Sequence, residues 1–429
     1  MSEERFDVIV VGAGMAGNAA AYALAKAGLE VLVVERGNAP GAKNVTGGRM
    51  YGHAMERLIP GFAQEAPIER KIARERLTLA TADGGMTIEY GSEYLKDPKR
   101  ASYSILRSKF DPWLAGKAEE LGAMYVPGIR VDDLLVRDGK VCGVVAGGEE
   151  MEADAVILAD GVNSLLAQKL GMKKEILPSQ VAVGAKEVIH LGEDVIDSRF
   201  AVEPGEGVAW LIAGDPTGGN IGGGFLYTDR DCVSVGLVTT VGDLGHSDLS
   251  VPEMVDRLKE HPAVKPYLAG GKTVEYSAHL VTEGGFDMMP ELCRDGVLVA
   301  GDAAALVLNL GFTIRGMDFA IESGRLAADA IIRAKERGDF SAASLSGYKT
   351  ALEQSFVMPD MEHYRKLPAF IENHRIFNEY PEMMDKVMKA MYVVDGAPPK
   401  RITKKAKGAL KPIGLMNLAK DGMKGLGAL

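Results

Sequence analysis

Glycines at a fixed spacing near the amino terminus could bind the phosphates of a nucleotide. They lie in the segment Gly12-Ala13-Gly14-Met15-Ala16-Gly17. In such a pattern the first glycine permits a tight turn, the second lets backbone approach a pyrophosphate, and the third lets a helix and a strand pack closely. Free N–H groups at the start of the following helix carry roughly half a positive charge, which attracts phosphate. The segment therefore predicts a bound dinucleotide.

A strand, a helix and a second strand must position this turn. Residues 6–11 are apolar and β-branched, which favours a short buried strand. Residues 15–26 are rich in alanine and predict a helix that ends near Gly28, and residues 30–35 predict the second strand. Glu35 ends that strand and could accept hydrogen bonds from the adenosine ribose. An acid there favours a free 2′-hydroxyl over a 2′-phosphate.

Two later segments also run from an apolar strand into a turn marked by glycine and aspartate. They end in Asp160-Gly161 and in Gly301-Asp302. With these three motifs in this order, the chain resembles the glutathione-reductase-type flavoproteins. That resemblance implies an extended FAD, with Asp302 bonded to its ribityl chain. It also implies that the helix expected over residues 317–333 points its amino terminus at the flavin pyrimidine edge, where a helix dipole stabilises the negative charge of the reduced ring.

Two arginines near these motifs are further candidates. In related flavoproteins the arginine that matches Arg107, at the start of a helix expected to run to Gly122, lies near the cofactor. Arg315 could add positive charge near the flavin or could face a partner protein. We therefore predict FAD as the cofactor and these residues as its binding site: Gly12, Gly14, Ala16, Gly17, Glu35, Arg36, Arg107, Asp160, Gly161, Gly301, Asp302, Gly311 and Thr313.

The middle of the chain narrows the resemblance. Here the chain resembles the FixC and electron-transfer-flavoprotein:quinone oxidoreductase family, within a geranylgeranyl-reductase-like superfamily. The similar segments are residues 207–211, 222–227, 270–279 and 283–286, together with the loop 41–49. Members pass electrons from an electron-transfer flavoprotein through FAD to a membrane quinone. The resemblance implies that Gly222, Gly223 and Gly271 line a quinone pocket. An alternative is that these glycines only form β-bulges and hairpin turns.

The cysteines mark a departure from the larger family members, which carry a four-iron cluster in a ferredoxin-like region. This chain has only Cys142, Cys232 and Cys293, without paired spacing, so we expect neither a cluster nor a disulfide framework. The short FixC-type members work beside a separate small ferredoxin-like subunit. The resemblance therefore implies a bifurcating complex with the alpha and beta subunits of an electron-transfer flavoprotein.

The predicted fold class is α/β. A Rossmann-type FAD-binding domain, residues 1–170 and 290–340, would carry an inserted antiparallel sheet for quinone or substrate, residues 171–289 with parts of 50–105. A helical region would follow over residues 341–397. The tail, residues 398–429, is basic and partly apolar, which suits an anionic membrane surface or a strap across an acidic partner or the protein itself. Its proline and glycines weaken any helix there.

Charge and composition exclude several other classes. A net charge of −10 argues against nucleic-acid binding, and the chain has no apolar run of the length that spans a membrane. Isolated thiols fit the cytoplasm, with peripheral contact at the inner face of the cell membrane as one option. The histidines are scattered, so we expect no metal and no catalytic side chain, because the flavin carries the chemistry. The alternatives are a geranylgeranyl-reductase-like prenyl reductase and a non-catalytic flavin relay or assembly subunit; a flavin monooxygenase or halogenase matches the middle of the chain poorly.

Overall fold

A largely parallel sheet forms the first of two sheets in the computed structural model, which describes residues 5–43, 48–396, 408–410 and 412–429. Its strands run in the order β16-β17-β10-β1-β2-β7, and β9 and β8 extend it from β10. The strands are β1 Arg5–Val11, β2 Val31–Glu35, β7 Met124–Pro127, β8 Val131–Arg137, β9 Lys140–Ala146, β10 Glu149–Leu158, β16 Cys293–Arg294 and β17 Val297–Val299.

The register of this sheet brings the three motif-bearing strands to one edge. In parallel pairing, Val11 of β1 lies opposite both Val34 of β2 and Leu158 of β10, and Leu158 lies opposite Val299 of β17. The strands read as continuous apolar runs because their side chains are buried in one core with those of the helices and of the β8–β9 pair. The turns after β1, β10 and β17 therefore meet at the carboxyl edge, where open α/β sheets bind ligands.

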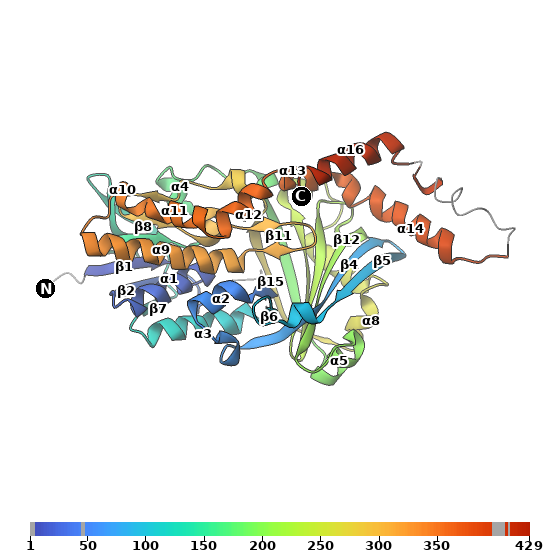
Figure 1. Cartoon of the computed structure of the whole chain (residues 1–429), viewed down its shortest axis with the longest axis horizontal. Coiled ribbons are helices and arrows are strands. Elements are labelled where there is room, and N and C mark those ends of the chain that lie inside the picture. Colours follow the sequence, from blue (N-terminus) through green and yellow to red (C-terminus); the bar gives the residue numbers. More distant parts are fainter. Residues whose placement is uncertain (1–4, 44–47, 397–407, 411) are drawn as a thin grey trace.

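Helices pack against this sheet and hold the first turn. α1 packs against both α3 and α9, and Figure 1 shows the three side by side. The chain folds this way because α1 is alanine-rich on every face and can bury itself between its neighbours. The helices of this part are α1 Met15–Lys26, α2 Gly52–Leu58, α3 Arg107–Glu119, α4 Leu165–Lys169 and α9 Met317–Arg337.

A nine-stranded second sheet lies beside the first along the long axis (Figure 1). It is antiparallel, as predicted, except where β12 pairs with β4 in parallel. The strands are β3 Arg49–Tyr51, β4 Ile68–Thr81, β5 Gly84–Gly91, β6 Ser102–Ile105, β11 Val181–His190, β12 Glu206–Gly214, β13 Gly222–Thr228, β14 Cys232–Thr240 and β15 Lys272–Thr282. The helices between them are α5 Glu193–Phe200, α6 Val241–Leu244, α7 Val251–Glu260 and α8 Lys265–Leu268.

The last part of the chain is helical, and the predicted helical region is broken into short pieces. A small hairpin, β18 Leu308–Asn309 and β19 Ile314–Arg315, precedes α9. After α9 come α10 Ala342–Leu345, α11 Gly347–Gln354, α12 Val357–His363, α13 Leu367–Ile371, α14 Glu379–Tyr392 and α16 Leu415–Leu426. Within the described ranges no helix is long and apolar enough to cross a membrane. The division at residues 170, 290, 340 and 397 remains our proposal.

The tail differs from the sequence expectation, because residues 415–426 form the helix α16 despite their glycines. The helix is amphipathic, and tertiary contacts to η7 (His374–Ile376) and α14 compensate for its low propensity: Arg375 and Tyr380 both donate hydrogen bonds to Asp421. Lys420 and Lys424 belong to this helix. The other basic residues of the predicted tail, Lys400, Arg401, Lys404, Lys405, Lys407 and Lys411, lie outside the described residues.

Candidate functional site

The glycine turn after β1 fits against the end of β10 with no room for a side chain. Gly12 has φ +101°, and a Cβ there would lie 2.4 Å from the carbonyl oxygen of Ala159. A Cβ on Gly17 would lie 1.9 Å from the oxygen of Gly12, so this glycine lets α1 pack onto the turn. Gly14 is the N-cap residue of α1. The amino terminus of the helix therefore opens at the carboxyl edge of the sheet.

Glu35 and Asn18 brace this turn. Glu35 accepts hydrogen bonds from the backbone N–H of Ala13, at 2.8 Å, and of Gly37, at 2.6 Å. Each carboxylate oxygen can accept a second bond, so the predicted contact with a ribose hydroxyl remains compatible with this arrangement. The buried Asn18 donates to the backbone oxygens of Ala13 and of Asp111 in α3. Sequence reasoning missed Asn18, because a polar residue inside an alanine-rich helix gives no sign of what it contacts.

Two aspartates from the other motifs face the same space. Burial raises the pKa of both Asp160 and Asp302. Lys173 holds the two turns together, since its ammonium group donates to the oxygens of Val162, at 2.7 Å, and Ala303, at 3.1 Å. Burial lowers the pKa of Lys173 to about 8, against the opposing effect of both aspartates. Sequence reasoning missed this lysine as well, because nothing in its neighbourhood along the chain marks it as functional.

The predicted arginines are both anchored by acids. Arg107 makes a two-pronged ion pair with Asp111, at 2.6 and 2.7 Å, and lies in the wall of the cavity described below. Arg315 pairs with Asp318 in α9 and Asp360 in α12. Arg315 therefore ties the β18–β19 hairpin to two helices, a role that neither sequence alternative included.

One cavity of about 790 Å³ joins these groups to the second sheet. At one end it is lined by Arg36, Lys43 and Arg130, the last of which pairs with Asp132 of the same lining, and along its length by the glycine turn and the amino terminus of α9. Its other end is apolar and is formed by the sheet and by α13. The predicted residues among its lining are Gly12, Gly14, Ala16, Glu35, Arg36, Arg107, Asp160, Gly161, Gly222, Gly223, Asp302 and Gly311.

Four predicted residues are not among those that line this cavity: Gly17, Gly271, Gly301 and Thr313. Gly17 acts in packing, and Gly301 does too, because a Cβ there would lie 2.7 Å from the Cβ of Ala16. Gly271 precedes β15 at the end where Lys272 pairs with His190 of β11, whereas the cavity meets β15 at its other end. The structure therefore brings Gly222 and Gly223 together in the cavity wall and leaves Gly271 apart from them.

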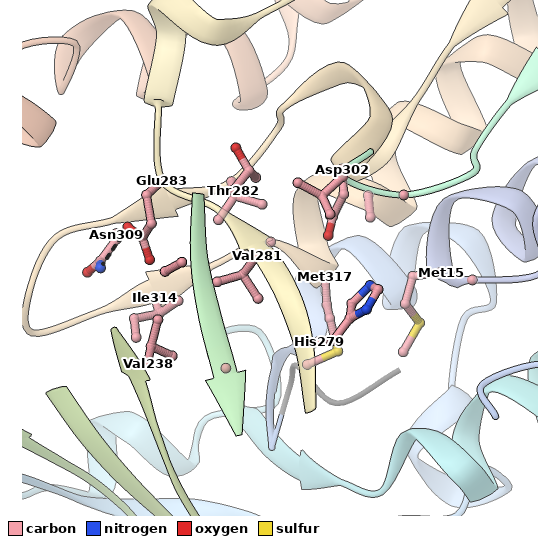
Figure 2. Close-up of a pocket in the computed structure, with 18 of the residues that line it drawn as sticks. Met15, Val238, His279, Val281, Thr282, Glu283, Asp302, Asn309, Ile314 and Met317 are labelled. Atoms are coloured by element: carbon pink, nitrogen blue, oxygen red, sulfur yellow. Dashed lines mark hydrogen bonds between the residues drawn. The ribbon is translucent and has the colours of Figure 1, made fainter. Parts of the chain in front are cut away.

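Several lining residues had no sequence signal. His279 reaches the cavity from β15, and burial lowers its pKa, with Arg36 and Arg107 adding to the effect. Figure 2 shows His279 beside Met317 and Met15, with Glu283 and Asn309 at the opposite end. A lone histidine on a strand looks structural in the sequence, and only sheet pairing reveals where it points. Among the described residues, no group of three His, Cys, Asp or Glu side chains could hold a metal.

The shape and lining of the cavity fit FAD. Its basic end and the helix terminus suit a pyrophosphate, its buried aspartates suit hydroxyl groups, and its apolar part suits a ring system. A family model described as an FAD binding domain matches residues 5–349. The chain is an FAD-dependent oxidoreductase with the glutathione-reductase-type fold.

The particular family follows from the whole chain. A model described as the ETF-QO/FixC family C-terminal domain matches residues 367–429. A probable electron transfer flavoprotein-quinone oxidoreductase, YdiS of Escherichia coli K12, is 52% identical and Protein FixC of Salmonella typhi is 54% identical, each over 100% of both chains. Protein FixC of Azotobacter vinelandii is 41% identical over 97% of this chain and 96% of its own. The chain belongs to the FixC / electron-transfer-flavoprotein:quinone oxidoreductase family.

Solved structures show the same fold at lower identity. A geranylgeranyl bacteriochlorophyll reductase-like protein from Thermoplasma acidophilum superposes with a TM-score of 0.73, at 21% identity, over 96% of this chain and 98% of its own. The flavin-dependent brominase Bmp2 gives a TM-score of 0.64 at 17% identity, over 95% and 99%. At these identities the likeness concerns the fold alone, because one fold serves many reactions.

Proposed function

We propose that this protein takes electrons from an electron-transfer flavoprotein onto FAD and passes them to a quinone. The observation that carries the proposal is the continuity of the cavity: the phosphate cradle and the apolar end belong to one space. The apolar side chains in its lining suit a quinone ring. The printed name of the relative from Escherichia coli, an electron transfer flavoprotein-quinone oxidoreductase, supports the same assignment.

In this proposal the chain supplies position and electrostatics, and FAD, when bound, supplies the two-electron chemistry. The amino terminus of α1, with Gly12 and Gly14, holds the pyrophosphate, and Asp160 and Asp302 accept hydrogen bonds from hydroxyl groups. Met317 and Gly316 place the amino terminus of α9 at the cavity wall, where its dipole stabilises negative charge on a reduced ring. Gly222 and Gly223 let the quinone approach the backbone of β13.

We also propose that the quinone enters from a membrane surface. Phe370 of α13 lines the cavity, and Gly425 of α16 packs against the same phenylalanine. On its outer side α16 exposes four large apolar side chains between lysines, as an interfacial helix does. They are Leu415, Met416, Met423 and Leu426. The protein would then be cytoplasmic and bind peripherally to an anionic membrane face.

The partners in this proposal are the alpha and beta subunits of the electron-transfer flavoprotein and a separate small ferredoxin-like subunit of a bifurcating complex. Cys142, Cys232 and Cys293 are free thiols, so a low-potential branch would need iron–sulfur chemistry on another chain. Co-purification of the holoprotein with these three subunits tests this assembly, and a stable complex that lacks the ferredoxin-like chain would contradict it.

The test of the function compares two tryptophan variants. Ile314→Trp enlarges a side chain that lines the apolar end of the cavity and is 38% exposed, whereas Ile88→Trp places the same change on strand β5 away from the cavity, with Ile88 58% exposed. We expect a reduced electron-transfer flavoprotein to bleach the FAD of both variants. Reoxidation by a water-soluble quinone should slow at least tenfold in Ile314→Trp only.

The alternatives give different results in the same assay. Saturation of a prenyl double bond by the reduced protein would assign a geranylgeranyl-reductase-like activity. FAD that is reduced and then passes no electrons to quinone until partner subunits are added would assign a relay or assembly role.

A further inference from the structure

Glu283 is a carboxyl group in the apolar end of the cavity. It follows β15 directly, is partly buried and lines the cavity together with Val238 of β14 and Ile314 of β19. Figure 2 shows Glu283 and Asn309 close to these two apolar side chains, while Asp302 and Met15 lie toward the other end. An acid in such surroundings is costly to keep ionised. Its presence there needs an explanation that the FAD cradle does not provide.

One backbone and one side-chain hydrogen bond hold Glu283 in place. The backbone N–H of Glu283 donates to the oxygen of Gln180, at 2.8 Å, and the side chain accepts a hydrogen bond from the amide of Asn309, at 3.2 Å. The amide oxygen of Asn309 in turn accepts from the N–H of Gly311, at 2.9 Å. Gly311 and Phe312 are exposed at the tip of the β18–β19 hairpin. Glu283 thus stands between the apolar cavity and a solvent-exposed loop.

Burial raises the pKa of Glu283 to about 7, and the bond from Asn309 opposes that rise. Charged groups on the surrounding elements are engaged elsewhere. They are Asp287 of η5 (Gly285–Met288), paired with Arg365; Asp243 of α6, which accepts from the N–H of Ile221; and Arg315 of β19, paired with Asp318 and Asp360. His279 of β15 also faces the cavity, and burial lowers its pKa, which favours the neutral ring. The acid is therefore poised for proton transfer near neutral pH.

We propose that Glu283 is the proton donor to the quinone; this inference rests on the proposed function. Conversion of a quinone into a quinol takes two electrons and two protons. The O–H bond of Glu283 breaks as one quinone carbonyl oxygen gains a proton and becomes a hydroxyl group. The electron pair and the other proton are supplied by the reduced cofactor. Water at the Gly311 loop then returns a proton to the Glu283 carboxylate.

The experiment compares the holoproteins of wild type, Glu283→Gln and Glu291→Gln. Glutamine keeps the hydrogen bond from Asn309 but holds no acidic proton, and Glu291 is an exposed glutamate nearby in sequence that pairs with Arg294. Each protein is reduced chemically without oxygen and mixed with a water-soluble quinone from pH 5.5 to 8.5, or with ferricenium, a one-electron acceptor that takes no proton. Infrared spectra of the oxidised proteins follow the carboxylic acid C=O band over the same range.

We expect wild-type reoxidation by quinone to fall as pH rises through about 7, because the donor must be protonated. Glu283→Gln should be slower by roughly a hundredfold at low pH and should lose this dependence. Glu291→Gln should match wild type, and ferricenium should reoxidise all three proteins equally. The C=O band should titrate near pH 7 in wild type and be missing in Glu283→Gln.

Three outcomes overturn the inference. In the first, Glu283→Gln reacts with quinone at the wild-type rate and with the wild-type pH profile; the proposed function then stands without this residue. In the second, no C=O band of Glu283 titrates between pH 5.5 and 8.5. In the third, wild type reacts with ferricenium but not with quinone, which overturns the proposed function as well.

Discussion

At Gly12 the backbone itself is the functional feature, since no side chain can occupy this place. The φ of +101° is unfavourable for any other residue, and the oxygen of Ala159 lies only 2.4 Å from the place of a Cβ. We expect Gly12→Ala to lose FAD and to be destabilised by more than the roughly 1–2 kcal/mol of left-handed strain. Flavin absorbance per protein and thermal unfolding measure the two effects.

Gly28→Ala is the matched control for this change. Gly28 has φ +81°, but nothing lies within 4 Å of the place where its Cβ would be. The variant should therefore show the strain alone and keep its full FAD content. If the two variants retain equal amounts of FAD, the close approach of the turn to β10 has no part in cofactor binding.

At the scale of elements, the buried carboxylate of Asp421 ties α16 to η7 and α14. Asp421 accepts from both Nε and Nη2 of Arg375, at 2.7 and 2.8 Å, and from the hydroxyl group of Tyr380, at 2.8 Å. The Arg375 guanidinium holds the pKa of Asp421 well below its usual range. We expect Asp421→Asn to loosen α16, so that amide hydrogens of residues 415–426 exchange at least several-fold faster at pH 7.

The stability that Asp421 contributes depends on pH in a defined direction. A carboxyl with a depressed pKa in the folded state contributes stability above its unfolded value, near 4, and loses it as pH falls through the folded value. The difference between wild type and Asp421→Asn should therefore be full at neutral pH and shrink below about pH 4. Lys420→Gln, at the exposed neighbouring position, serves as the control and should exchange like wild type. Equal exchange in Asp421→Asn would show that apolar packing alone holds the helix.

At the scale of the whole molecule, the net charge of the protein disfavours the proposed contact with an anionic membrane. The chain carries −10, which an anionic membrane repels, so the proposed binding comes from the basic, partly apolar tail, of which α16 is the main described part. We expect a Met416→Glu and Leu426→Glu double variant, at side chains 85% and 82% exposed, to reduce sedimentation with anionic lipid vesicles several-fold. The physical reason is loss of apolar burial together with added negative charge.

Ile88→Glu and Val274→Glu together make the control, since both residues are large, apolar and exposed on strands of the second sheet, and the charge added is the same. Vesicle binding that drops equally in both double variants would indicate a general charge effect and not a surface on α16. In that case the tail would be a better candidate for contact with a protein partner.

The sequence determined by itself those parts of the protein whose physics is local. Turn geometry, helix termini and strand runs depend on neighbours a few residues apart, so the spacing of Gly12, Gly14 and Gly17 predicted the first turn and its helix. The FAD cofactor, the α/β class and the family followed from such segments and from the resemblance that they carry. The expectation that proline and glycines weaken any helix in the tail used propensity, which is also local, and left out the bonds that Asp421 makes across the fold.

Only the tertiary structure decided which distant residues share the cavity. A strand pattern tells which side chains share a face, but not which strand lies alongside, because pairing is set by the packing of the whole sheet. β15 pairs with β11 so that His279 lies opposite Gly184, and Glu283 follows where the strand leaves the sheet beside Asn309. Burial then decided the chemistry of these side chains, since the same carboxyl group in water would stay ionised at neutral pH. Lys173 joins two turns that lie more than a hundred residues apart in the chain for the same non-local reason.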